Sequence, residues 1–215
     1  IKAVTYVLLA ILLILASFLI FKNLSDNYLW QDEAESAVLA RNILHFGYPK
    51  AFDGLNIVTS NIYSGFGNGY AWKYHPWLHF YLISLSYAIL GVSAFSSRLQ
   101  FALLGFLAIV IIFFLAKRLF KKDSIALLSV LLTITSVPFL LHIRQCRYYS
   151  LQMFLVLAII WIYLNVLEKN GKCLWQLGAL FAALCYTNHG AFIPVFGSVI
   201  AHFFFVNKER SLRNK

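Results

Sequence analysis

The sequence predicts an all-α protein that crosses a membrane several times, and three observations support this fold class. Hydrophobic residues make up 61% of the 215 residues and charged residues only 12%, about half the charged share of a soluble domain. Long apolar runs alternate with short polar ones, as in helices that span the ~30 Å hydrocarbon core of a bilayer. Basic residues lie mostly at the ends of these runs, so the net charge of +10 indicates membrane lipids and no nucleic acid as partners.

Six apolar runs are predicted to be membrane-spanning helices: about 4–22, 97–117, 124–143, 148–167, 173–188 and 190–207. The first run lacks the small-residue cleavage site of a signal peptide, so we expect it to stay in the protein as the first span. The chain begins at Ile1 without a methionine and ends just after an apolar run. We therefore expect it to be the N-terminal part of a longer protein. The three scattered cysteines predict neither a disulfide framework nor a zinc site.

A seventh apolar run, 77–92, decides the topology. Its 16 residues are at the short limit for a span and are rich in Trp, His, Tyr and Ser, which favours a helix lying in the interface. The cations at 117–122 then share the cytoplasmic side with those at 169–172 and 208–215, and the first loop lies outside. A spanning run would instead be favoured by a raw count of Lys and Arg. We prefer the interfacial helix because a long loop orients weakly and this loop holds five of the eight acidic residues.

The first extracytoplasmic loop, 23–96 with the interfacial run, is predicted to contain juxtamembrane helices. A helix over 33–46 is expected, with Asp32 as its N-cap, Glu35 completing a capping box, and Gly47 and Pro49 ending it. The glycine-rich aromatic stretch 63–72 predicts an irregular, mobile loop.

Five charged side chains are the main candidates for chemistry. Asp32 and Glu33 follow the first span by about ten residues, where a carboxylate can act as general base toward a hydroxyl or bind a metal. Arg144 and Arg147 flank a turn on the same predicted side, and Arg98 begins a span there. Guanidinium groups suit phosphate because they donate paired hydrogen bonds. The alternatives stay open: Asp32 as a helix cap only, and the arginines as anchors among lipid headgroups.

Lys73, His75 and Tyr148 complete the set of predicted substrate-binding residues. His75 precedes the interfacial run in the segment 73–77 (KYHPW), where a lone histidine among aromatic residues is otherwise an interfacial anchor. His79 is expected to be a packing or interface residue. A divalent metal ion near Glu33 or His75 stays open, and the sequence predicts no set of metal ligands.

Five segments occur in a recognisable order: 30–49 (WQDEAESAVLARNILHFGYP), 74–81 (YHPWLHFY), 95–99 (FSSRL), 115–120 (LAKRLF) and 144–149 (RQCRYY). In this order the chain resembles the N-terminal half of the GT-C membrane glycosyltransferases. It is most similar to the group of protein mannosyltransferases and aminoarabinose transferases. The likeness covers most of the chain. One departure is Trp77 after Pro76, where the family often has Pro-Pro.

The resemblance implies a helical fold with an extracytoplasmic active site and a polyprenyl-phosphate-linked sugar as donor. It makes Asp32 the expected catalytic base, with Glu33 as its motif partner, and places an interfacial helix at 77–92. Residues 1–215 would then be the N-terminal part of a GT-C transmembrane domain whose remainder is missing. The expected reaction is an inverting transfer to a hydroxyl of a lipid or protein acceptor, with the arginines on the donor phosphate and the 55–72 loop closing over the site.

Two other function classes are weighed against this one. A transporter or lipid flippase would need ionisable residues or broken helices near the middle of the bilayer. Pro138 interrupts one run, but the charges cluster at the surfaces. A non-catalytic membrane subunit could share the fold, and the intact Asp-Glu and arginine motifs argue against it. We expect a multi-pass cell-membrane protein, with the bacterial inner membrane as the leading location.

Overall fold

The computed structural model describes residues 2–58, 65–168 and 173–213, and their side chains from residue 3 to residue 205. The helices are, in chain order, α1 (Lys2–Phe21), α2 (Gln31–Phe46), the 3₁₀ turn η1 (Asn68–Tyr70), α3 (Leu78–Leu90), α4 (Ala94–Phe120), α5 (Asp123–Ile134), α6 (Val137–Ile143), α7 (Tyr149–Glu168), α8 (Leu174–Cys185) and α9 (His189–Arg213). Within the described ranges only three isolated β-bridges accompany them. The predicted all-α class is confirmed.

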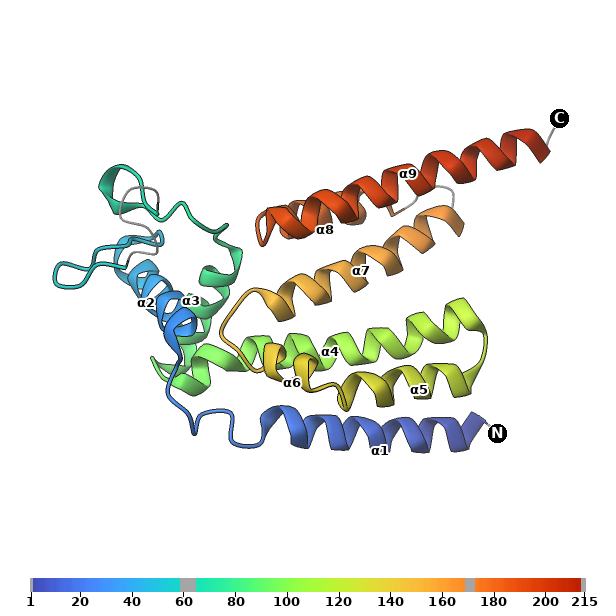
Figure 1. Cartoon of the computed structure of the whole chain (residues 1–215), viewed down its shortest axis with the longest axis horizontal. Helices are drawn as coiled ribbons and strands as arrows, with labels where there is room; N and C mark the ends of the chain where they lie inside the picture. The colour runs from blue at the N-terminus through green and yellow to red at the C-terminus, as the bar shows by residue number, and fades with distance from the viewer. Residues whose placement is uncertain (1, 59–64, 169–172, 214–215) are drawn as a thin grey trace.

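The helices form a bundle, and one end of it, the elaborate end, carries additional short elements. Figure 1 shows α1, α4, α5, α7, α8 and α9 running roughly along one direction, while α2, α3 and the loop between them gather at one end. The beginning of α1, the turn between α4 and α5, and the end of α9 lie at the opposite end. The basic residues of the α4–α5 turn are therefore separated by the length of the bundle from the first loop.

Three helices are long and apolar enough to cross a bilayer: Ala3–Phe21, Ala94–Phe120 and Tyr149–Glu168. A fourth span results if α5 and α6 are counted together, although they are bent by 68° at their junction. Leu174–Cys185 and His189–Phe205 are apolar but shorter. The prediction of a polytopic membrane protein is confirmed. Of the six predicted spans, three helices meet the length and composition of a span, or four with the bent pair.

The predicted span 124–143 is in fact two helices joined by a sharp bend. Ser136 begins the second of them, where its Oγ accepts from the Phe139 N–H at 3.4 Å, and Pro138 follows in the first turn. Proline has no N–H to continue the preceding helix, so it suits such a start. After the bend α6 packs against α4 at Gly105, where an added Cβ would lie 2.6 Å from the Ile143 Cβ. This close approach fixes the position of the segment 144–148 that follows α6.

The short helix α3 packs against α2 on one side and against the start of the long helix α4 on the other. It lies beside α2 at the elaborate end of the bundle (Figure 1). His79, Phe80, Ile83 and Tyr87 form its buried face, whereas Leu85, Ile89 and Leu90 at its end are exposed. With 13 residues, α3 is too short to cross the ~30 Å hydrocarbon core, which suits the interfacial position predicted for 77–92.

The start of α2 differs from the prediction. The helix begins at Gln31, with Trp30 at the N-cap position and without a side-chain cap. Asp32 therefore lies inside the first turn and is not the N-cap, and it is Glu33, not Glu35, that accepts from the N–H of the capping residue, at 3.4 Å. The predicted end is confirmed: Gly47 has the left-handed φ of 77° and its N–H donates to the Ile43 carbonyl.

The described parts of the loop between α2 and α3 are pinned by backbone hydrogen bonds. The Ala51 N–H donates to the Tyr70 carbonyl at 2.7 Å, and the Trp72 N–H donates to the Pro49 carbonyl at 2.9 Å. The Trp72 side chain is fully buried. The stretch predicted to be irregular and mobile, 63–72, is thus tied to the segment after α2 through Tyr70 and Trp72, and its residues 63 and 64 lie outside the described ranges.

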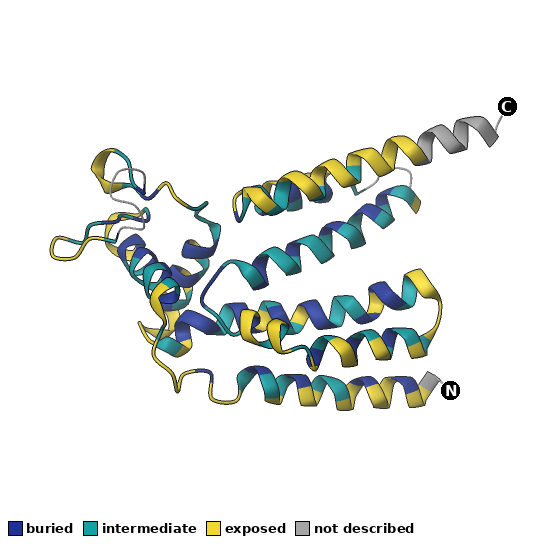
Figure 2. Ribbon diagram, in the orientation of Figure 1, coloured by how far each residue is buried: buried dark blue, intermediate teal, exposed yellow. Residues whose placement is uncertain are grey.

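Two clusters of buried apolar residues hold the helices together. One joins α2, α3, α7 and α8, and the other joins α1, α4, α5 and α6. Figure 2 shows the buried residues facing between the helices, with exposed residues along the outer faces of α1, α5 and α9. Many of the exposed residues are large and apolar, such as Phe18 and Phe204, as expected of helices that face lipid.

Candidate functional site

Glu33 is the most completely sequestered carboxylate at the elaborate end. Its side chain is 1% exposed. Oε1 accepts from Arg98 Nε at 2.9 Å and from the Cys146 N–H at 2.7 Å, while Oε2 accepts from Arg98 Nη2 at 2.6 Å. With the longer bond from the Trp30 N–H, all four acceptor positions of the carboxylate are used. Glu33 therefore ties together three segments that are far apart in the sequence.

Arg98, at the first turns of α4, is saturated in the same way. Besides its paired bonds to Glu33, Nη1 donates to the carbonyls of Leu24 and Asn27, and Nη2 donates to the carbonyl of Tyr28. A guanidinium has five N–H groups, and these bonds use all of them. The side chain is 9% exposed. In this structure Arg98 fixes the path of the chain between α1 and α2 and has no N–H left for a phosphate.

Asp32 and Arg147 form an ion pair on the face of α2 beside the one that carries Glu33. Arg147 Nη2 lies 3.4 Å from Asp32 Oδ2, and Nη1 donates to the Asp32 carbonyl at 3.1 Å. Nη1 also donates to Glu35 Oε1 at 3.4 Å and to Ser36 Oγ at 3.2 Å. The Asp32 side chain is 40% exposed, whereas that of Arg147 is 6% exposed. The site thus pairs an accessible carboxylate with a buried cation.

Arg147 is not fully satisfied by these contacts. Its Nε is buried and has no hydrogen-bond partner among the described residues, and the same holds for the hydroxyl of Ser150 in the first turn of α7. Buried donors without partners are rare and indicate either an unusual site or a missing ligand. The start of α7 is therefore a place where a polar ligand would add bonds that the protein itself does not supply.

His75 and Tyr148 border this pair. Their rings lie 5.7 Å apart, and the Arg147 guanidinium lies 5.6 Å from the Tyr148 ring. Burial, reinforced by the positive charge of Arg147, lowers the pKa of His75 to about 4. His75 is neutral at physiological pH, so it can accept or donate a hydrogen bond but adds no charge.

Glu35, Ser36 and His79 were not predicted as site residues, but the structure places them here. Glu35 and Ser36 follow Asp32 by three and four residues on α2, so they share its face; this spacing was a signal in the sequence. Burial raises the pKa of the Glu35 carboxyl despite the nearby Arg147. His79 was expected to pack, and it is fully buried, with its ring 5.7 Å from that of Tyr148.

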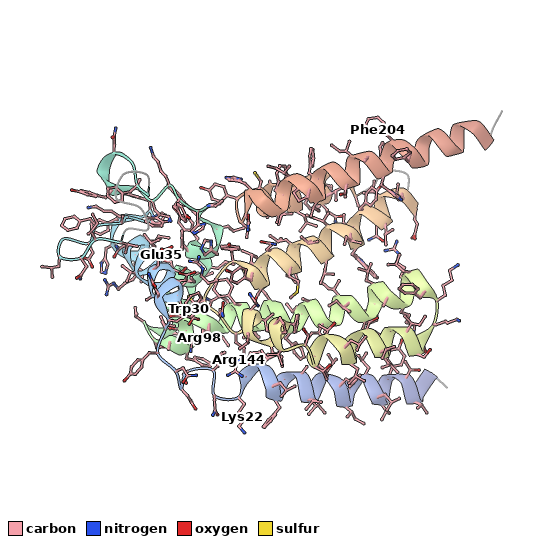
Figure 3. The ribbon with its side chains drawn as sticks, viewed as in Figure 1. Lys22, Trp30, Glu35, Arg98, Arg144 and Phe204 are labelled. Atoms are coloured by element: carbon pink, nitrogen blue, oxygen red, sulfur yellow. The ribbon has the colours of Figure 1, made fainter. Side chains whose placement is uncertain are left out.

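Arg144 and Lys73 lie apart from Asp32. Arg144 donates to the carbonyl of Leu19 in the last turn of α1 and to the carbonyls of Lys22 and Asn23 just beyond the helix. Figure 3 shows Arg144 near Lys22 at this end of α1. Lys73 is exposed, and its aliphatic stem lies against Gly67 in the first loop. The predicted site residues therefore fall into separate groups, with Asp32, Arg147, His75 and Tyr148 together.

A cavity of about 610 Å³ lies on the other side of the Glu33–Arg98 pair. It is bordered by the end of α1, the start of the first loop and α6; its lining includes Arg144 and Gln145 but neither Asp32 nor Arg147. Among the described residues no group of three or more His, Cys, Asp or Glu side chains is arranged to hold a metal ion. Glu33, one of the two residues near which a metal was considered, is occupied by Arg98 and backbone N–H groups.

A helical membrane protein with a carboxylate and arginines gathered at one end of its bundle has the features of a GT-C membrane glycosyltransferase. The sequence model of the dolichyl-phosphate-mannose-protein mannosyltransferase family matches residues 74–215, and the chain belongs to this family. Neither the curated proteins nor the solved structures gave a match. The match includes Arg98, Arg144 and Arg147 but begins after Asp32 and Glu33, so their assignment depends on the structure and on the motif order.

Proposed function

We propose that this membrane glycosyltransferase moves a sugar from a polyprenyl-phosphate donor to an acceptor hydroxyl, with Asp32 as the general base and Arg147 as the phosphate ligand. The observation that supports this most directly is the contact between an accessible carboxylate and a buried, incompletely bonded guanidinium, 3.4 Å apart. In such a site the acceptor and the leaving group can be bound next to each other.

The acceptor step uses Asp32. Its carboxylate takes the proton of the acceptor hydroxyl as the oxygen attacks the anomeric carbon, so the negative charge never develops fully on the oxygen. The bond from the anomeric carbon to the phosphate oxygen breaks, and its electron pair leaves with the polyprenyl phosphate. Attack opposite the leaving group inverts the configuration. Asp32 suits this role better than Glu33 because it is 40% exposed and Glu33 is 1% exposed.

The donor step uses Arg147 and not Arg98. As the glycosidic bond breaks, charge builds up on the phosphate, and a pre-positioned guanidinium stabilises it. Arg147 has an unpartnered Nε and lies directly before the first turn of α7, where the helix dipole also favours an anion. All five N–H groups of Arg98 are bonded to protein acceptors. We assign Arg98 and Glu33 to positioning the two segments that present Asp32 and Arg147.

The test is sugar transfer by the full-length enzyme with the substitution Asp32→Asn. Transfer of labelled sugar from a polyprenyl-phosphate donor should fall by about 10²–10⁴-fold, the usual contribution of a general base. The control is Asp26→Asn, which removes an exposed carboxylate from the same loop and should leave the rate within twofold of the wild type, roughly. Near-normal transfer by the Asp32 variant would remove Asp32 from the mechanism, and the absence of transfer by the wild-type protein would favour a non-catalytic subunit.

We further propose that the site faces the extracytoplasmic side. The cations Lys117, Arg118, Lys121 and Lys122 lie at the far end of α4 from Arg98, and such a cluster favours the cytoplasm. Reporter tags inserted after Gly54 and after Lys121 should be accessible from opposite sides of the membrane. Accessibility of both tags from one side would contradict the proposed orientation. The acceptor is a lipid or protein hydroxyl that reaches the site from outside.

A further inference from the structure

The cavity lined by Arg144 is separate from the Asp32–Arg147 site and has an unbalanced positive charge. Of the charged side chains that line it, Glu33 is neutralised by Arg98, which leaves Arg144. Among the described residues no carboxylate lies within ion-pair distance of Arg144. Its three hydrogen bonds go to backbone carbonyls, so two of its five N–H groups have no acceptor in the described part of the chain. An anionic ligand would complete this site.

The polar and apolar parts of the cavity are divided in a way that suits an amphiphile. Asn23, Asn27 and Gln145 supply amide groups near Arg144. On the α6 side the lining residues Val137 and Leu141 are 63% and 58% exposed. Figure 2 shows exposed residues along α6 and along the outer face of α1. A phosphate and its polar substituent would therefore contact the amides and Arg144 while acyl chains lie along the exposed apolar surface.

The rim of the cavity also resembles a membrane–water boundary. Tyr28 and Trp30 line the cavity and are 98% and 46% exposed, and such aromatic residues concentrate at the level of lipid headgroups. Lys22 directly follows the apolar part of α1, and its ammonium group lies over the Phe18 ring at 4.9 Å; it does not line the cavity, but it adds a second cation at this end of α1, where Figure 3 shows it near Arg144. Two cations at headgroup level attract anionic lipid.

We propose that this cavity binds the phosphate headgroup of an anionic glycerophospholipid, which stabilises the junction between the end of α1 and α6. That this lipid is distinct from the sugar donor rests on the proposed function, because the cavity contains neither Asp32 nor Arg147. Arg144 bonds to the last carbonyls of α1 and to the lipid at the same time, so an occupied site fixes the position of α1 against α6. The binding of an anionic lipid at Arg144 is itself argued from the cavity alone.

The experiment measures the thermal stability of the purified full-length protein in detergent during titration with defined lipids. Phosphatidylglycerol should raise the melting temperature in a saturable manner, whereas phosphatidylcholine with the same acyl chains should not. The variant Asn27→Asp places a negative charge in the cavity and keeps every Arg144 bond to α1. It should need about tenfold more phosphatidylglycerol for half of the effect. Asn68→Asp adds the same charge in the exposed part of the first loop and should titrate like the wild type.

Several outcomes would overturn the proposal. Equal stabilisation by both phospholipids would mean that the cavity does not select an anion. An Asn27→Asp variant that titrates like the wild type would place the lipid elsewhere. If inorganic phosphate alone saturated the response, the ligand would be a free anion. If polyprenyl phosphate gave an effect sensitive to Asn27→Asp and phosphatidylglycerol gave none, the cavity would belong to the donor.

Discussion

Asp32 and Glu33 are neighbours in the chain, yet their carboxylates have opposite environments. Glu33 is 1% exposed and receives four hydrogen bonds, two of them from Arg98. Asp32 is 40% exposed and has one cation 3.4 Å away. Consecutive side chains on a helix point about 100° apart. The first turn of α2 therefore directs Glu33 to the interior and Asp32 to the surface. The same short motif thus supplies one carboxylate that joins segments of the fold and one that is accessible to a ligand.

The arginines differ in the same way. Arg98 uses all five N–H groups on protein acceptors, whereas the Nε of the buried Arg147 has no partner among the described residues. A buried ion pair with every bond satisfied is costly to break, and it specifies one arrangement of its segments. An incompletely bonded cation beside an exposed carboxylate can instead bind a ligand without losing existing bonds. Burial and bond saturation distinguish the two regions better than residue type does.

The largest effect is expected from Glu33→Ala. This substitution leaves the Arg98 charge buried without its partner and removes the acceptor of the Cys146 N–H, so we expect a loss of about 3–5 kcal/mol in stability. Thermal unfolding in detergent would measure it. Asp32→Asn is the matched control, because a partly exposed ion pair contributes about 1 kcal/mol or less. If the two variants had the same melting temperature, the contrast between the two acids would be wrong.

Exchange of the two charges, Glu33→Arg with Arg98→Glu, tests the same contrast more sharply. The double variant keeps an ion pair, but it places a carboxylate against the carbonyls of Leu24, Asn27 and Tyr28. We therefore expect no recovery of stability relative to Glu33→Ala. Recovery would show that the pair contributes only its charges and that the hydrogen bonds to the first loop are dispensable.

Much of the fold could be predicted from the sequence, because hydropathy and helix-stop residues are local signals. The bounds of α4 and α7 and the stop at Gly47 follow from such signals. The bend between α5 and α6 was less evident, although Pro138 in the apolar run indicated an interruption. The start of α2 was predicted wrongly because Glu33 makes bonds to Arg98 and Cys146, 65 and 113 residues away. No local pattern reveals such distant partners.

For the candidate site, the residue types were proposed from the sequence, whereas the grouping of their side chains was predicted only in part. Asp32 and Arg147 do lie together, as the predicted interfacial helix requires. The assignment of three arginines to one phosphate could not be checked in the sequence, since hydrogen-bond saturation depends on backbone carbonyls from other segments. Arg144 contacts the end of α1, which no spacing indicates. The contribution of Glu35 and Ser36, in contrast, was visible as the i+3 and i+4 positions after Asp32.

An intermediate effect is expected from Arg147→Lys. Lysine keeps the charge but cannot reproduce the planar group that reaches Asp32, Glu35 and Ser36 together. We expect the apparent KM for the polyprenyl-phosphate donor to rise by about tenfold. Arg144→Lys makes the same chemical change in the other region and should leave the donor KM within twofold, roughly. A larger effect at Arg144 than at Arg147 would move the donor phosphate to the cavity beside α1.

The smallest effect concerns pH and His75. Its pKa in the folded protein is about 4, lowered first by burial and then by Arg147, against about 6.5 in an unfolded chain. Between these values the unfolded state binds more protons, so this group makes stability rise with pH, and the stability is lost as pH falls from 6.5 toward 4. The drop in melting temperature from pH 7.5 to pH 5 should therefore be smaller in His75→Gln than in the wild type. Glu35, whose pKa is raised by burial, acts in the opposite direction but is present in both proteins, so it cancels in the comparison.

The control is His45→Gln, at an exposed position of α2, which should show the same drop in melting temperature as the wild type. If His45→Gln and His75→Gln reduced the drop equally, the burial of His75 would not be the cause of the sensitivity to acid.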